Sequence, residues 1–514
     1  MTSSMVAILI AFILYLTIMV IVGLKNAKGN NSASDFFLGG RKVGPFVTAL
    51  SAEASDSSAW LLMGLPGLCY LGGIKETFWT ALGLIIGTYL NWLFVAKPLR
   101  KCSIAFGDSI TIPEFFTNRF KDKTNVLSIV SAFFIVFFFT IYTASGFVAC
   151  AKLFNSIFGL NYYIGLAIGM VVILSYTILG GYSAVCKTDF IQGTLIFVAF
   201  VVSSIVALVA LGGPTNAFHR VQEFDASAIA GQFGEEMQSK FLANQKFSVM
   251  SAISAFAWCL GYFGMPHIII RFMGIRSNKE IKTARRVGII WMIIAYIGTF
   301  LIGTMGTAYL AGNDFSNPIL ILKGGAAETV FSEVMLKMYP AFIAGIFLCA
   351  ILAASMSTAD SQLLAASSAI SHDIFKRLIK KDATDKQVLL VGRITVLVIA
   401  AIAFCLSLNP ASSIFGLVSY AWAGFGAAFG PIILLCLYWK GITNKGAIAG
   451  IIGGGVTVVA WHNFPASWGA IFGLYEIIPG FIVCLLLAVI VSLCDKNKNS
   501  EMLEDFAKYK AMPD

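Results

Sequence analysis

Long apolar stretches, separated by short polar connections, follow one another along almost the whole chain. Most are about 20 residues long, the length that a helix needs to cross about 30 Å of hydrocarbon. The ninth is too long for one crossing, so we expect a short surface helix near 329–337 and then a span from about 340 to 371. The pattern predicts thirteen membrane-spanning helices, at residues 5–24, 46–72, 75–97, 125–155, 162–182, 188–212, 247–268, 287–311, 329–371, 388–408, 412–438, 445–464 and 473–493.

Composition agrees with this pattern. The chain is 58% hydrophobic and only 12% charged, whereas soluble proteins average about 25% charged residues. A membrane β-barrel would show short alternating segments instead. The first stretch, residues 5–24, has neither a basic leader nor a small-residue cleavage site, so we expect it to remain as a span. The predicted fold class is an all-α polytopic membrane protein.

Basic residues cluster in alternate connections, at 25–42, 100–123, 271–286 and 376–386. Only seven of the 36 Lys and Arg residues fall on the other side, which leaves 29 with these clusters. Because cytoplasmic loops carry the excess of Lys and Arg, we expect the amino terminus outside and the carboxyl terminus in the cytoplasm, in the plasma (inner) membrane. The net charge of +10 follows from this topology, and no nucleic-acid partner is expected.

One acid stands inside an apolar span. Asp56 lies in the hydroxyl-rich segment 51–60, followed by Gly64, Pro66 and Gly67. An ionised Asp at mid-bilayer costs about 2.5–3.5 kcal/mol on insertion scales, and such residues usually mark an ion or substrate pathway. The segment therefore predicts a helix that opens its backbone around a cation, with the break at the Gly-x-Pro-Gly sequence.

A second interrupted span, at residues 258–266, lies five spans later. Interrupted helices at matching places in two halves are typical of inverted-repeat transporters with a site at the midplane. An odd number of spans per repeat forces the two repeats to be inverted. The expected organisation is a first helix and cytoplasmic loop, a first repeat, a second repeat, and two peripheral helices with a short tail, at 1–45, 46–212, 247–438 and 439–514.

The ninth span carries a second polar group. Ala354, Ser357 and Thr358 stand at i, i+3 and i+4 and share one helix face. Where the second span opens, the carbonyls of Ala54 and Ser57 lose their helical partners. Neutral oxygens without a direct carboxylate suit Na⁺ better than Ca²⁺. The alternative for the hydroxyls is interhelical packing or bonding to their own helix.

Other chemistry finds little support in the sequence. The 10 cysteines and 4 histidines are dispersed, so we expect neither a transition-metal site nor a cofactor other than Na⁺ as the coupling ion. No span carries a filter-like motif or charged ring, which argues against a channel. We expect no enzyme activity and no obligate protein partner. The lipid bilayer is the expected surrounding.

At these residues the chain resembles the sodium/solute symporter family, and most closely its sodium/proline symporters. The resemblance runs from about residue 10 to 490. The matching segments are Gly39–Ser51, Ser58–Gly67, Phe139–Tyr142, Gly261–Gly264, Pro266–His267, Gly416–Pro431 and Gly473–Gly480.

The resemblance implies a LeuT-like core of two inverted five-helix repeats. It implies sodium ligands at Ala54, Ser57, Ala354, Ser357 and Thr358. It links Asp56 and Ser58 to ion and substrate handling, and Arg41 and Asp189 to ion coupling or release. It implies that proline is surrounded by Tyr142, Trp258, Tyr262 and Pro266.

The expected function is sodium-coupled uptake of L-proline by alternating access. The alternatives are symport of pantothenate, another amino acid or a sugar, and coupling to protons. Glu53 stands where those symporters carry a small residue; Ser57, Ala59 and Met265 also depart from the pattern. One hypothesis is that Glu53 adds an ion-attracting group near the site. The other is that it pairs with a cation such as Arg41.

Overall fold

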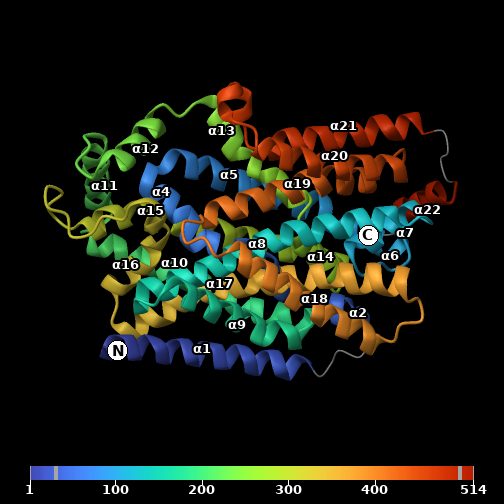
Figure 1. The fold of residues 1–514 in the computed structure, drawn as a ribbon, viewed down its shortest axis with the longest axis horizontal. Helices are drawn as coiled ribbons and strands as arrows, with labels where there is room; N and C mark the ends of the chain where they lie inside the picture. Colours follow the sequence, from blue (N-terminus) through green and yellow to red (C-terminus); the bar gives the residue numbers. More distant parts are fainter. Residues whose placement is uncertain (1, 28–32, 496–499, 513–514) are drawn as a thin grey trace.

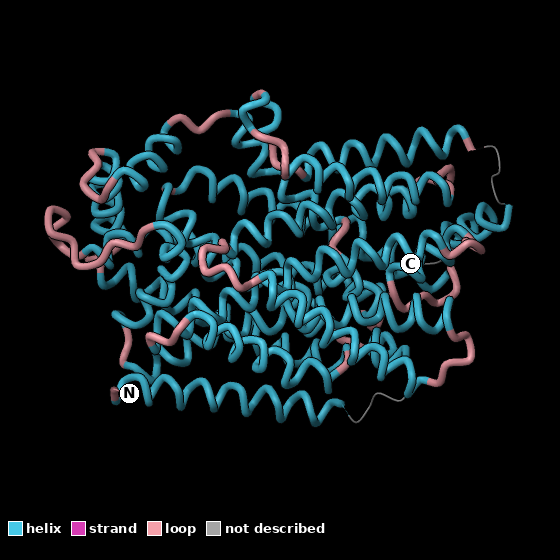
Figure 2. The backbone as a smooth tube through the Cα atoms, in the orientation of Figure 1, coloured by secondary structure: helices cyan, strands magenta, loops and turns pink. Residues whose placement is uncertain are grey.

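The computed structural model describes residues 2–27, 33–495 and 500–512, so the first and last predicted units include a few residues outside the described ones. Helices make up nearly all of the described chain (Figure 2). Each of the thirteen predicted stretches coincides with helix. The continuous long helices are α1 (Ser3–Ala27), α5 (Ile74–Leu90), α8 (Val126–Phe158), α9 (Tyr162–Gly180), α10 (Tyr182–Ala210), α15 (Ile281–Ala311), α17 (Ala341–Ser368), α18 (Asp385–Leu406), α19 (Ile414–Tyr438), α20 (Asn444–His462) and α21 (Ile477–Cys494).

Two of the predicted spans are broken. The second consists of α3 (Pro45–Ala59), a wide π-helical turn (Trp60–Gly64) and α4 (Leu65–Gly72). The seventh consists of α13 (Val249–Phe256), a tight 3-10 turn (Ala257–Phe263) and α14 (Pro266–Gly274). The shorter helices are α2 (Ala33–Leu38), α6 (Lys97–Ala105), α7 (Ile112–Phe120), α11 (Pro214–Ile229), α12 (Glu235–Gln245), α16 (Val330–Met338) and α22 (Ser500–Ala511).

Nine helices of the described chain are long and apolar enough to cross a membrane by themselves, or ten if one bent pair is counted. The remaining predicted spans are the two broken ones, the short α9 and the glycine-rich α20. The expected helix near 329–337 is α16, but it is not a surface helix. Val330, Phe331 and Met335 are buried, because α16 packs its apolar side against α15 and α17.

Local sequence signals account for several helix ends. Thr384 and Gln387 form a reciprocal capping box at the start of α18. The hydroxyls of Ser413 and Thr443 cap α19 and α20 by accepting backbone N–H groups. Gly159 ends α8 in the left-handed conformation, with a φ of 62°.

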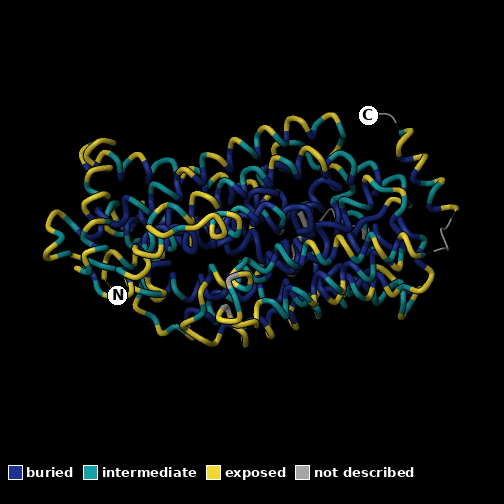
Figure 3. Tube along the Cα trace, turned by 90° about the horizontal axis from the view of Figure 1, so that it is seen from above, coloured by how far each residue is buried: buried dark blue, intermediate teal, exposed yellow. Residues whose placement is uncertain are grey.

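The helices run side by side as an elongated bundle, with α1 along one edge and α20 and α21 along the opposite edge (Figure 1). Buried residues gather along the middle, and exposed residues line the outside and the ends (Figure 3). The long helices α17 and α19 are the most buried, whereas α1 and α21 are mostly exposed. Helices α3 and α14 contact α17 in this interior, which brings the two broken spans and the ninth span together.

Candidate functional site

The first break lies at Ser58. Its backbone has a φ of 46° and a ψ of −179°, which no helical residue adopts. The Ser58 hydroxyl accepts the N–H of Trp60 at 3.1 Å and so partners a donor that the break releases. The predicted opening at Gly64–Gly67 is wrong. Pro66 lies in the first turn of α4, where proline needs no N–H and is tolerated.

The second break lies at Gly264 and Met265, as the sequence predicts. Met265 is extended, with a φ of −78° and a ψ of 104°, and α14 then starts at Pro266. The span continues to Gly274 rather than ending near residue 268. Both breaks lie in the buried interior of the bundle, where Ser58 is 3% exposed and Met265 is fully buried.

Oxygen atoms gather where α17 meets α3. The Ser357 hydroxyl donates to the Ala54 carbonyl at 2.9 Å and lies 3.2 Å from the Ala354 carbonyl. The Thr358 hydroxyl donates to the carbonyl of Ser55 at 2.8 Å. The Ser57 hydroxyl instead bonds to the Glu53 carbonyl of its own helix at 2.6 Å. These oxygens are neutral and close-set, which suits a small monovalent cation.

The structure therefore brings together three of the five predicted ligand residues, Ala54, Ala354 and Ser357. Thr358 is adjacent but contacts Ser55, which the sequence analysis did not select. The carbonyl of Ser57 accepts the N–H of Trp60, and no hydrogen bond among the described residues joins it to α17. Helical periodicity places Ser357 and Thr358 on the face of α17 that contacts α3. It could not predict which carbonyl of α3 each hydroxyl contacts.

Asp56 joins the two broken spans. The residue is 7% exposed, and its Oδ2 accepts the Tyr262 hydroxyl at 2.5 Å. The Tyr142 hydroxyl lies 3.5 Å from the Asp56 carbonyl oxygen. Ser58, two residues further along, is at the break. The predicted substrate residues Tyr142 of α8 and Tyr262 of the 3-10 turn thus both contact Asp56 of α3.

Aromatic rings pack together beside these residues. Trp258 stacks on Trp60 with ring centroids 5.0 Å apart, and Tyr475 stacks on Trp258 at 5.4 Å. The Trp422 indole donates to the Trp258 carbonyl at 2.8 Å. Gly261 permits this approach, since a Cβ there would lie 2.0 Å from Nε1 of Trp422. Trp60, Trp422 and Tyr475 were not predicted as site residues, although all three lie in the segments that carry the family resemblance.

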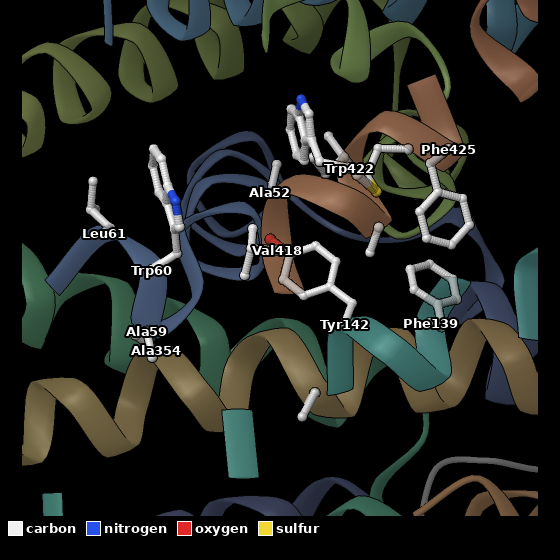
Figure 4. Close-up of a cluster of buried hydrophobic side chains, with 14 of the residues drawn as sticks. Ala52, Ala59, Trp60, Leu61, Phe139, Tyr142, Ala354, Val418, Trp422 and Phe425 are labelled. Atoms are coloured by element: carbon white, nitrogen blue, oxygen red, sulfur yellow. The ribbon is translucent and has the colours of Figure 1, made fainter. Parts of the chain in front are cut away.

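Figure 4 shows the apolar side of this region. Phe139 and Tyr142 project from α8, and Phe425 faces Phe139, with ring centroids 4.3 Å apart. Trp60 lies at the left of this view with Ala354 of α17 below it, and Trp422 lies at the top, on the same helix as Phe425. The enclosure suits a compact solute with an apolar portion.

Asp189 takes part in a buried ion pair that the sequence did not predict. Its Oδ2 lies 3.3 Å from Arg271 of α14 and accepts the hydroxyls of Ser51 and Ser55 at 2.6 and 3.1 Å. Arg271 also bonds to Ser361 of α17. Assigning Arg271 to a cytoplasmic connection was therefore wrong, because α14 extends past it and the side chain is 1% exposed.

Glu53 is 2% exposed and accepts the Trp92 indole N–H at 3.1 Å. Its expected pairing with Arg41 is wrong. Arg41 lies in the connection before α3 and bonds to Asp108 at 3.0 Å and to the Met273 carbonyl at 2.7 Å. Glu53 thus lies in the interior, one turn from Asp56, with Trp92 as its hydrogen-bond donor.

A cavity of about 600 Å³ leads away from the aromatic rings. Trp258, Phe415 and Tyr475 line its inner end, and Glu76 and Lys240 line it farther out. Its volume lies within the range of small-molecule sites. The cavity provides a route between the stacked rings and the end of the molecule that carries α12.

The chain is similar to known proteins over almost its whole length. The model of the sodium:solute symporter family matches residues 36–454. The chain is 44% identical to the osmoregulated proline transporter OpuE of Bacillus subtilis over 494 residues, 96% of each chain. It is 42% identical to the sodium/proline symporter of Escherichia coli over 507 residues, which cover 98% of this chain and 96% of that one.

Solved structures show the same fold. A Na⁺-coupled sialic acid symporter in a substrate-bound outward-open state aligns with a TM-score of 0.74 at 20% identity, covering 96% of this chain and 99% of that chain. MhsT in complex with L-phenylalanine aligns with a TM-score of 0.52 at 18% identity, covering 88% and 99%. The predicted LeuT-like fold is confirmed. With its family match over most of its length, the chain is a multi-pass membrane transporter that belongs to the sodium:solute symporter family.

Proposed function

We propose that this chain takes up L-proline by symport with sodium, through alternating access. The observation that carries the proposal is the hydrogen bond between Asp56 and Tyr262, which joins two broken spans beside the oxygens of Ala54 and Ser357. The names of the relatives support the substrate, since sodium/proline symporters are 42–43% identical over almost the whole chain.

Sodium would occupy the oxygens between α3 and α17. We assign it to Ala54, Ala354 and Ser357, with the predicted Thr358 and Ser57 at the edge of the group. A cation there replaces the hydroxyl proton as partner of the Ala54 carbonyl, and each hydroxyl turns its lone pairs inward. Sodium thereby fixes the position of α3 against α17, up to the break at Ser58.

Proline fits the adjoining enclosure. It is a compact zwitterion with an apolar ring, and aromatic faces attract its cationic nitrogen. Tyr142, Trp258 and Tyr262 supply such faces, and the break before Pro266 releases backbone groups that can receive a carboxylate. Ser58, at the other break, is a second polar contact for the solute.

Coupling follows from the shared segment 54–58, which carries sodium oxygens at one end and substrate contacts at the other. If sodium raises the affinity for proline, proline raises the affinity for sodium by the same factor. One Na⁺ with a zwitterion moves one net charge, for which the membrane potential supplies about 2.3 kcal/mol per 100 mV. We propose a stoichiometry of one to one.

Asp189 and Arg41 are proposed to act in ion coupling from the other end of α3. Asp189 bonds to Ser55, whose carbonyl receives Thr358. This gives a continuous polar route from the sodium oxygens to the buried pair with Arg271. The proposed orientation has the amino terminus outside and the carboxyl terminus in the cytoplasm of the inner membrane. Segments 46–212 and 247–438 form the two inverted repeats.

Uptake of labelled L-proline into proteoliposomes tests the proposal. An inward sodium gradient is expected to drive accumulation, an inside-negative potential to accelerate it, and a proton gradient alone to leave it unchanged. Excess pantothenate, other amino acids and sugars serve as competitors. Failure of proline to accumulate, with a competitor accumulated instead, would assign another substrate. A reversal potential with a sodium-to-proline slope of two would reject the one-to-one stoichiometry.

A further inference from the structure

A second cavity, of about 490 Å³, lies outside the proposed transport route. It is enclosed by α11, the end of α10, one face of α15 and the tip of α4. The first cavity, in contrast, opens onto Trp258 and the residues of α13. None of the proposed sodium or proline residues lines the second cavity.

Its walls are mainly apolar. Leu208, Phe218, Leu301 and Met305 contribute them from three different helices. Asp225 of α11 is the only charged side chain among the described residues that line the space. The volume lies within the range of pockets that hold drug-sized molecules, which are mostly apolar with a few polar groups that fix orientation.

The Asp225 carboxylate is half-buried and has no hydrogen-bond or ion-pair partner among the described residues. Burial raises the pKa of this carboxyl to about 6, because no neighbouring cation or donor offsets the loss of water. Above that pH the Asp225 carboxyl is ionised inside an apolar cavity. Such a carboxylate is stabilised by a ligand that has a cationic group to pair with it and an apolar part to fill the cavity.

The rim of the cavity indicates how a ligand enters. Phe218 and Ile74 are 62% and 48% exposed, although both are large and apolar. Both lie at the ends of spans: Phe218 is in the connecting helix α11, which follows α10, and Ile74 is the first residue of α5, directly after the turn that ends α4. Apolar side chains exposed at such a boundary favour contact with molecules that partition into the membrane interface.

The wall between the two cavities is the tip of α4. Gly73 lines both spaces, Cys69 faces the second cavity, and Leu68 and Leu71 face the first. Helix α4 follows the π-helical turn Trp60–Gly64 and lies beyond the non-helical residue Ser58 of α3. A molecule in the second cavity would therefore contact α4, the same short helix that lines the first cavity leading to Trp258.

From this geometry we propose that the second cavity is a binding site for an amphiphilic ammonium compound, with the cation on Asp225 and the apolar body between α10, α11 and α15. Occupancy holds α4 against α11 and α15 and thereby slows transport. The site is separate from the proposed sodium and proline sites, and its binding test does not depend on which solute is transported.

Binding of radiolabelled 4-phenylbutylammonium to the full-length protein in phosphatidylcholine nanodiscs tests the site at pH 8. Saturable binding is expected, with an affinity at least ~10-fold above that of the uncharged isostere 4-phenylbutan-1-ol. Asp225→Asn should reduce it by ~10-fold or more. Glu223→Gln removes an exposed acid of the same helix and should leave it unchanged. Thr304→Trp fills the cavity, keeps the carboxylate and should also abolish binding.

Two sources share this chemistry, a free amine and an aminophospholipid headgroup. Weaker probe binding in phosphatidylethanolamine nanodiscs supports the site with the lipid as its occupant, and equal binding supports it with a free amine. Non-saturable binding, equal affinity for the alcohol, or undiminished binding to both Asp225→Asn and Thr304→Trp would overturn the proposal. Thermal unfolding of each variant verifies that it is folded, so a loss of binding is read only from intact protein.

Discussion

Replacing Tyr262 by Phe removes one hydroxyl from the contact between the two broken spans. That hydroxyl donates to Oδ2 of Asp56 at 2.5 Å and is the hydrogen-bond donor to this carboxylate among the described residues. The phenyl ring is retained, so its packing against Trp422, at a centroid distance of 5.0 Å, persists. The change therefore tests the bond and not the aromatic enclosure.

The size of the effect follows from the charge and burial of Asp56. A hydrogen bond to a charged group contributes about 1.5–3 kcal/mol. Because about 1.4 kcal/mol corresponds to a factor of ten in affinity, Tyr262→Phe should weaken the apparent affinity for proline by ~10- to 150-fold. Tyr142→Phe provides a matched control. Its hydroxyl lies 3.5 Å from a neutral carbonyl oxygen, which is the outer limit of a hydrogen bond, and its loss should cost less than about fivefold.

Sodium-dependent proline binding and initial uptake rates, measured on both purified variants in proteoliposomes, make the comparison. Thermal unfolding in detergent checks that each variant is folded. Equal small effects for the two substitutions, in folded protein, would refute the role given to the bond between Asp56 and Tyr262.

Three further predictions concern the same interior. Ser357→Ala should raise the sodium concentration for half-maximal uptake ~10-fold or more. Ser355→Ala is the control: the Ser355 hydroxyl bonds within its own helix at 2.9 Å, and its loss should change that concentration less than about twofold. Equal sodium curves for the two variants would contradict the ligand assignment. Asp189→Asn leaves Arg271 buried without its carboxylate, so thermal unfolding should reveal a loss of about 3–5 kcal/mol that the additional change Arg271→Met largely restores. Glu53→Gln keeps an acceptor for the Trp92 indole N–H but removes the carboxylate, so we expect an altered sodium dependence of proline uptake. Identical sodium curves in wild type and variant would remove Glu53 from the ion path.

Much of the architecture could be predicted because hydrophobic length and glycine or proline interruptions are local properties of the chain. The position of the first break could not. Gly64, Pro66 and Gly67 are the residues that usually interrupt a helix, yet the chain opens at Ser58, in a backbone conformation that costs energy for any residue with a Cβ. The hydrogen bond that the Ser58 hydroxyl accepts from the Trp60 N–H offsets part of that cost locally, and packing against α17, which depends on tertiary structure, offsets more of it.

The buried pair of Asp189 and Arg271 is a similar case. In sequence, Arg271 follows three isoleucines near a cluster of basic residues, which is also how a span ends at a cytoplasmic loop. Only the placement of α14 between α3, α10 and α17 reveals its carboxylate partner. That Ser357 and Thr358 share one face of α17 could be predicted, since helical spacing alone determines it, and in the structure both hydroxyls bond to carbonyls of α3.

The stacked indoles have a spectroscopic consequence. Trp60 and Trp258 belong to the two different broken spans and lie almost parallel, 29° apart, at 5.0 Å, and Trp422 of α19 follows at 6.2 Å from Trp258. Chromophores this close share their electronic excitation, so the near-ultraviolet circular dichroism of the protein reports the relative orientation of the broken spans. A change of conformation on adding sodium or solute becomes visible as an optical signal in the unlabelled wild-type chain.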